Sequence, residues 1–147
     1  MQVATEITDY GFLPAERAWF IKSAVEGFAL GCLPAFRRWG LPPLYRSGVR
    51  FRLPPEHGSG IELMRLPIYT YADGWGDCDR LLIWWLCEQW TLGLPARCST
   101  YFLGGQMHVC GRRSWDDTGP IEDPAIVLGA PMPPGWPPRV PLIRRFP

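Results

Sequence analysis

The feature that most constrains this chain is an apolar segment, residues 81–92, with turn residues on both sides. Because almost every position in it is apolar, a helix formed here keeps only a narrow polar stripe and must be buried on most sides. A glycine-rich turn, residues 74–77, precedes the segment. Gly93 and Pro95 end it, since glycine suits the position after a helix and proline cannot continue one. The sequence therefore predicts a central buried helix, with a polar stripe of Arg80, Trp84, Glu88 and Thr91.

The composition is that of one folded domain. The 147 residues, of which 47% are hydrophobic and 14% aromatic, are enough to bury a core that needs no disulfide or metal ion to stabilise it. A net charge of +1 gives no sign of a nucleic-acid partner or an anionic membrane. No stretch reaches the roughly 18–20 apolar residues that a membrane span needs. The first residues lack the basic and apolar regions of a signal peptide.

The cysteines indicate a reduced protein. There are five of them, an odd number, and no C-x-x-C pair occurs. A disulfide framework or a structural zinc site is therefore not expected, and reduced thiols in a cytosol fit better. We expect four of the five to be packing residues, namely Cys32, Cys87, Cys98 and Cys110, with the alternative that Cys110 lines the site.

The segments before the central helix are predicted from the prolines and glycines that start, end or exclude a helix. Pro14 followed by Glu16 predicts a helix over residues 14–30, which Gly31 can end, and residues 33–40 predict another short turn of helix. Prolines exclude a long helix from residues 41–67. Within that range residues 45–53 predict an edge strand. His57 falls in a glycine-, serine- and proline-rich loop, so we leave it out of the site.

Two runs after the central helix predict a β-hairpin. Residues 96–103 and 106–113 are separated by Gly104 and Gly105, a signal for a two-residue turn. This turn sets a register in which Tyr101 pairs with His108, so that both lie on one sheet face with Ser99 and Cys110. A short third strand over residues 120–124 then places Asp123 one strand away from His108. Arg112 and Arg113 are expected at a solvated strand end.

Three residues have the chemistry of nucleophilic catalysis. Cys78 opens the central helix, where unpaired N–H groups and the helix dipole favour an anion, and the thiolate is the reactive form of cysteine. His108 and Asp123 can complete a Cys-His-Asp site. Two neighbouring aspartates, Asp77 and Asp79, oppose activation because negative charge raises the pKa of a thiol. Asp77 can instead be engaged as a helix cap.

The same residue types leave a metal alternative open. Cys78, Asp79, His108 and Asp123 are of kinds that bind zinc. They lack the paired spacing of zinc ligands, so we expect no metal and no other cofactor.

Four short motifs follow one another along residues 68–130. They are G-D-C-D at residues 76–79, G-L-P-A-R at 93–97, H-V at 108–109 and E-D-P at 122–124. In this order they resemble the transglutaminase-like branch of the papain-type cysteine enzyme superfamily. The short form, with a proline-rich end, is similar to small members encoded among the structural genes of tailed bacteriophages.

The resemblance implies an α+β fold with a papain/transglutaminase-like core, in which a central buried helix packs on a small antiparallel sheet. Residues 1–130 are then a single domain, with the core at about 68–130 and a helical and extended N-terminal part at 1–67. The proline-rich residues 131–147 are expected to form a polyproline-like arm that wraps over the domain or reaches a partner.

The resemblance also implies an activity and its residues. Cys78 would attack the acyl carbon of an amide, His108 would move the proton, Asp123 would orient the imidazole, and the backbone N–H of residue 78 would bind the oxyanion. Water resolves the thioester in a peptidase or amidase and an amine does so in a transglutaminase; the residues fit both. Trp75, Asp77 and Tyr101 are further substrate or oxyanion candidates.

Two kinds of partner follow from these interpretations. An active enzyme would take a peptide or a peptidoglycan-type amide, in the host cytoplasm or on the virion. The alternative is a catalytically silent virion structural or assembly protein that uses the same fold as a binding module. Its proline-rich arm would dock to phage structural proteins. Neither interpretation involves nucleic acid or membrane.

Overall fold

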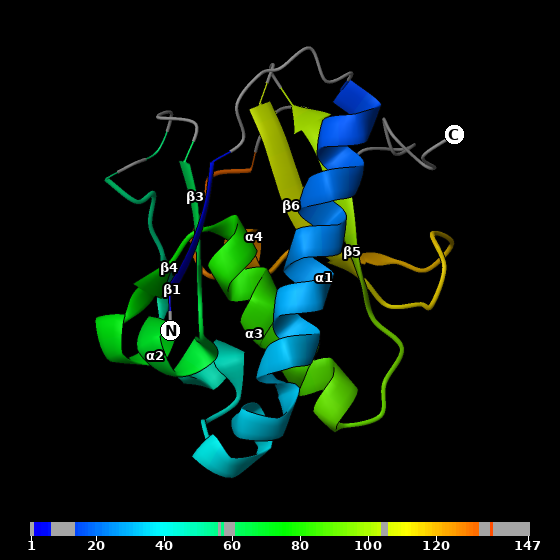
Figure 1. Cartoon of the computed structure of the whole chain (residues 1–147). Helices are drawn as coiled ribbons and strands as arrows, with labels where there is room; N and C mark the ends of the chain where they lie inside the picture. The colour runs from blue at the N-terminus through cyan, green and yellow to red at the C-terminus, as the bar shows by residue number, and fades with distance from the viewer. Residues whose placement is uncertain are drawn as a thin grey trace.

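Helix α3 (Cys78–Thr91) lies at the centre of the computed structural model, which describes residues 2–6, 14–55, 57, 61–103, 106–132 and 136. The elements that pack most extensively against it are α1 (Pro14–Trp39), α2 (Pro67–Asp73), α4 (Pro124–Val127) and strand β6 (Gln106–Arg112), as Figure 1 shows. The fold is therefore of the predicted α+β class, with helices and small sheets around a buried helix.

The two ends of α3 form as predicted. The Asp77 side chain accepts a hydrogen bond from the backbone N–H of Arg80 at 3.4 Å, which is the contact of a helix cap. Gly93, just beyond the helix, has φ of +72°, a left-handed conformation that glycine adopts at no steric cost. Both boundaries thus follow from local chemistry.

The polar stripe predicted on α3 is wrong at two positions. Arg80 is 2% exposed and Trp84 is 0% exposed. The Arg80 Nε donates to the carbonyl of Leu63 in strand β3 (Ile61–Arg65) at 3.1 Å, and the Tyr71 ring of α2 packs edge-on against Trp84. Segments remote in sequence therefore cover this side of the helix.

Helix α1 is longer than predicted. It runs from Pro14 to Trp39 without a break at Gly31, and Pro34 lies inside it. The core-facing row continues past both residues, because Cys32 and Phe36 are buried in line with Ala29. Pro34 is on the exposed side, where water can satisfy the carbonyl that loses its helical hydrogen bond.

The main sheet contains β5 (Arg97–Leu103), β6 and β7 (Ile121–Glu122), paired antiparallel in that order. The predicted hairpin register is confirmed over its whole length, with Tyr101 opposite His108. The Gly104–Gly105 turn itself lies outside the described residues. Strand β7 is shorter than predicted, because Asp123 is already the N-cap of helix α4.

Residues 41–67 differ from the prediction. A 3₁₀ turn, Leu44–Arg46, stands where an edge strand was expected, and only β2 (Arg50–Phe51) is extended, paired in parallel with β4 (Trp75–Gly76). Leu44 is buried, so packing of this side chain favours the turn over a strand. A further antiparallel pair, β1 (Gln2–Glu6) with β3 (Ile61–Arg65), was not predicted. His57 is exposed, and of the arm only residues 131, 132 and 136 are described.

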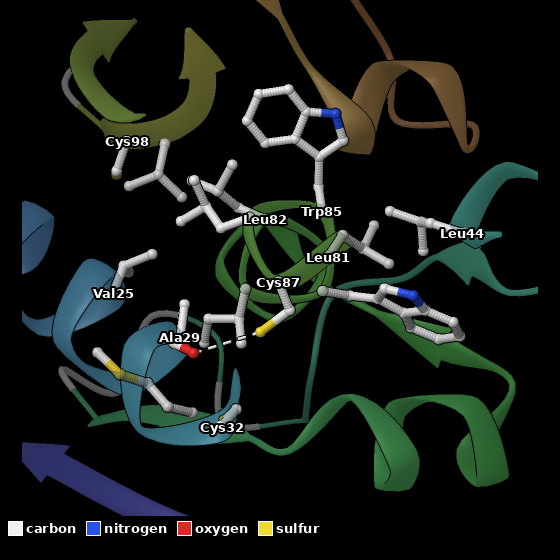
Figure 2. Close-up of a cluster of buried hydrophobic side chains, with 14 of the residues drawn as sticks. Val25, Ala29, Cys32, Leu44, Leu81, Leu82, Trp85, Cys87 and Cys98 are labelled. Atoms are coloured by element: carbon white, nitrogen blue, oxygen red, sulfur yellow. Dashed lines mark hydrogen bonds between the residues drawn. The ribbon is translucent and has the colours of Figure 1, made fainter. Parts of the chain in front are cut away.

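The hydrophobic core surrounds α3 on several sides. In Figure 2 the side chains of Leu81, Leu82 and Trp85 point outward from α3 in different directions. Helix α1 contributes Val25, Ala29 and Cys32 on one side, and Cys98 reaches in from β5. The Cys87 thiol donates to the Ala29 carbonyl at 3.4 Å. The four cysteines predicted to be packing residues are all buried, and Cys32, Cys87 and Cys98 belong to the hydrophobic core cluster.

In the part of the chain that the structure describes, no helix has both the length and the apolarity to cross a bilayer.

Candidate active site

The candidate imidazole is held by the β5–β6 hairpin. His108 lies directly opposite Tyr101 in the antiparallel register, so both side chains are on one sheet face. Because the face alternates along a strand, Cys110 and Arg112 share it with His108. The pairing of β5 with β6 and the alternation together determine where the imidazole is placed.

The Asp123 carboxyl group lies in hydrogen-bonding contact with this imidazole. Its Oδ2 lies 2.6 Å from His108 Nε2, and the Asp123 side chain is only 4% exposed. Its other oxygen, Oδ1, accepts from the backbone N–H groups of Ala125 at 3.0 Å and Ile126 at 3.3 Å. The carboxylate is thus fixed by α4, and because Nε2 is taken, Nδ1 is the imidazole nitrogen that remains for a thiol.

Glu122 ties β7 to the core beside Asp123. It accepts hydrogen bonds from Trp85 Nε1 at 2.8 Å, from Tyr45 Oη at 2.6 Å and from Arg113 Nε. Burial alone would raise the pKa of Glu122, but these hydrogen bonds outweigh it and hold the pKa below its ordinary value. The carboxylate therefore stays ionised and keeps β7 against α3.

Close packing of α3 against β6 needs a glycine on the strand. A Cβ placed on Gly111 would come within 2.5 Å of Trp85 Cζ3. Gly111 is paired with Glu122, so the indole of Trp85 fills the space over this pair and bonds to Glu122. This contact sets how closely α3 approaches the strand that carries His108.

Cys78 is the first residue of α3. Its side chain is partly buried and packs against the hydrophobic core, and it is not in a disulfide. The other four cysteines are buried. Burial is also the main cause that raises the pKa of the Cys110 thiol, and the nearby Asp123 charge adds to it. Cys110 is therefore a poor nucleophile although it shares the face of His108.

The strand alternation separates two sides of the sheet. Trp85 packs on the Gly111 side, whereas His108 lies on the opposite face by alternation. Strand β7 pairs with β6 only at Gly111 and Arg112. Within the described residues the β6 edge at His108 thus has no strand beside it on the β7 side.

The further candidates occupy distinct places. Trp75 is half-buried beside two guanidinium groups, of Arg80 at 4.7 Å and of Arg52 at 5.4 Å from its ring centre. Asp77 is buried and caps α3, as the helix-cap alternative predicted. The Tyr101 side chain is fully buried, and its hydroxyl accepts from Arg112 Nη2 at 2.7 Å.

The sequence did not predict that two further residues, Arg112 and Trp136, lie near the site. Arg112, expected at a solvated strand end, is 7% exposed. Its guanidinium donates to Ser99 Oγ at 3.1 Å and to the Gly119 carbonyl at 2.6 Å, besides Tyr101. The alternation that places Arg112 on the His108 face was the available signal. Trp136, in the proline-rich arm, packs edge-on against His108, and no local pattern indicated this.

The described residues contain no group of three or more histidine, cysteine or acidic side chains arranged to hold a metal ion. The zinc alternative therefore gains no support from them.

Comparison with known proteins assigns this chain to no family. No protein-family model matches the chain, and no curated protein and no solved structure matches it either.

Proposed function

We propose that this chain is a thiol-dependent acyl-transfer enzyme with a papain/transglutaminase-like core, in which Cys78, His108 and Asp123 act on an amide bond. The observation that supports it most is the short His108–Asp123 contact, 2.6 Å between Nε2 and Oδ2. A second support is that Cys78 is the first residue of a capped helix, where a thiolate is favoured.

The proposed reaction has two stages. The Cys78 sulfur attacks the acyl carbon while its proton passes to His108, and the proton then goes to the departing amine, which leaves a thioester. Water or a second amine attacks the thioester and returns the thiol. Asp123 keeps the imidazole in the tautomer that presents Nδ1, and the Cys78 backbone N–H stabilises the oxyanion.

The proposal requires that the Cys78 thiol and the His108 imidazole come together at one edge of the main sheet. Trp85 and His108 lie on opposite sides of the main sheet, so the thiol of Cys78 must reach Nδ1 around the β6 edge where β7 is absent. Trp85 lies against Gly111, and Cys78 is about two turns, roughly 10 Å, from Trp85 towards the start of α3. His108 is three residues from Gly111, also roughly 10 Å along the strand.

The substrate class and setting are proposed from the motif resemblance. It favours a peptide or a peptidoglycan-type cross-bridge, in a bacteriophage context, with either hydrolysis or transfer to an amine. Incubation with peptidoglycan fragments and with a primary-amine acceptor distinguishes the two. Release of new carboxyl groups supports hydrolysis, whereas incorporation of the acceptor supports transfer.

The experiment for the proposed site is alkylation with iodoacetamide at neutral pH, followed by peptide mapping. An ordinary thiol is only a few per cent ionised at pH 7, whereas a thiol paired with an imidazole is largely ionised. We expect Cys78 to be labelled before the four buried cysteines, and His108→Ala to slow its labelling by roughly 10- to 30-fold.

His57→Ala is the matched control, because His57 is exposed and is the only other histidine. It should leave the labelling rate unchanged. Slow labelling of Cys78 that does not respond to His108→Ala would contradict the enzyme and favour the silent binding module.

A further inference from the structure

We propose that Trp136 is a positioning residue for the His108 imidazole, an inference that rests on the proposed function. The indole and imidazole centres are 5.3 Å apart and their planes are 87° to each other. This is an edge-to-face arrangement, the favoured geometry for a pair of aromatic rings. A residue of the proline-rich arm thus contacts the side chain that the reaction needs.

The contact restricts the imidazole from a second direction. Asp123 holds Nε2 but leaves the ring free to tilt about that hydrogen bond. A perpendicular indole opposes the tilt, because it would break the edge-to-face contact. The His108 side chain is only 20% exposed, so little space remains for another orientation. Asp123 and Trp136 together therefore favour one orientation of Nδ1.

Trp136 is itself supported by buried groups. Its ring also packs edge-on against Tyr101, with centres 5.5 Å apart at 84°. Tyr101 is fully buried and bonded to Arg112, and Arg112 is held by Ser99. Because Tyr101 and His108 are directly paired across the hairpin, the Trp136 indole packs against both rings. The hydrogen bonds that hold Tyr101 therefore also determine the position of the indole.

This arrangement gives Trp136 a role within the site as well as any docking role of the arm. Removing the indole should loosen the imidazole without removing either the hydrogen bond to Asp123 or the thiol. The expected result is a partial loss of the His108-dependent reactivity of Cys78, smaller than the loss in His108→Ala.

The test uses protein labelled with isotopic histidine, in which only His57 and His108 give signals. In the wild type, we expect the His108 ring protons to show a ring-current shift and the Nε2–H held by Asp123 to exchange slowly with water. Trp136→Leu should remove the shift and speed this exchange, and Trp136→Phe should restore most of both. His57 is the internal reference.

Alkylation of Cys78 is measured on the same variants. Trp136→Leu should lower the rate by about 3- to 10-fold, the equivalent of one aromatic contact, and Trp136→Phe should recover it. Trp115→Leu is the matched control, because Trp115 is 61% exposed, and it should change neither measurement.

The outcomes separate the two proposals. Unchanged His108 exchange in Trp136→Leu overturns the positioning role, whatever Cys78 does. Faster exchange with unchanged labelling also overturns it, provided that labelling depends on His108. If wild-type labelling is independent of His108, the proposed function fails, and the exchange measurement alone decides whether Trp136 positions the imidazole.

Discussion

The Asp123 carboxylate holds the His108 imidazole with one oxygen and caps helix α4 with the other. The candidate site and the local fold therefore share a single side chain. Because α4 also packs against α3, the orientation of the imidazole is connected to the element that begins with Cys78. A change at residue 123 can separate the two roles.

Asp123→Asn and Asp123→Ala should differ in stability. Asparagine is as good a helix cap as aspartate, so Asp123→Asn should cost little, whereas Asp123→Ala should cost about 0.5–2 kcal/mol. Both should slow alkylation of Cys78, since neither presents a carboxylate to His108. Urea unfolding and labelling rates check this. Equal stability loss in the two variants would contradict the capping role.

Glu122→Gln should destabilise the protein at neutral pH by about 1–3 kcal/mol, because it removes the charge from a carboxylate with three donors. The pKa of Glu122 is lowered in the folded protein. Its contribution is therefore present above the unfolded-state pKa, about 4.3, and is lost as pH falls through the folded pKa. The stability difference between wild type and Glu122→Gln should shrink in that range. A difference that stays constant down to strongly acidic pH would contradict the assignment.

Gly111→Ala and Gly27→Ala should have opposite effects. A methyl at residue 111 meets Trp85 within 2.5 Å, and overpacking of this kind costs about 1–3 kcal/mol. A methyl at residue 27 meets nothing within 4 Å and lies inside α1. In a helix interior alanine is more stabilising than glycine by about 1 kcal/mol. Thermal unfolding of both variants is the measurement. A stabilised Gly111→Ala would show that Trp85 does not pack there.

Local sequence chemistry predicts some elements well. The ends of α3 follow from Asp77 and Gly93, and the register that pairs Tyr101 with His108 follows from a two-residue turn and strict alternation. To predict that Asp123 lies beside His108 required only one further strand, after the hairpin. In each case the determining residues are close together in the chain.

Elsewhere, remote contacts decide the structure. Helix α1 continues through Gly31 and Pro34 because Cys32 and Phe36 reach the core. Arg80 is buried because β3 supplies a carbonyl that accepts its hydrogen bond. Arg112 is buried because Ser99, Tyr101 and Gly119 accept hydrogen bonds from its guanidinium. Trp136 belongs to a segment whose composition predicts only an extended chain, so its contact with His108 could not be predicted.

The most direct test of the account is the ultraviolet absorbance of the thiolate as a function of pH, taken as the difference between wild type and Cys78→Ser. This difference isolates Cys78 from the other cysteines and requires no substrate. We predict a thiolate signal that is already present at neutral pH and is lost at that pH in His108→Ala. A signal that appears only near the ordinary thiol pKa of about 8.5, with or without His108, would contradict the proposed site.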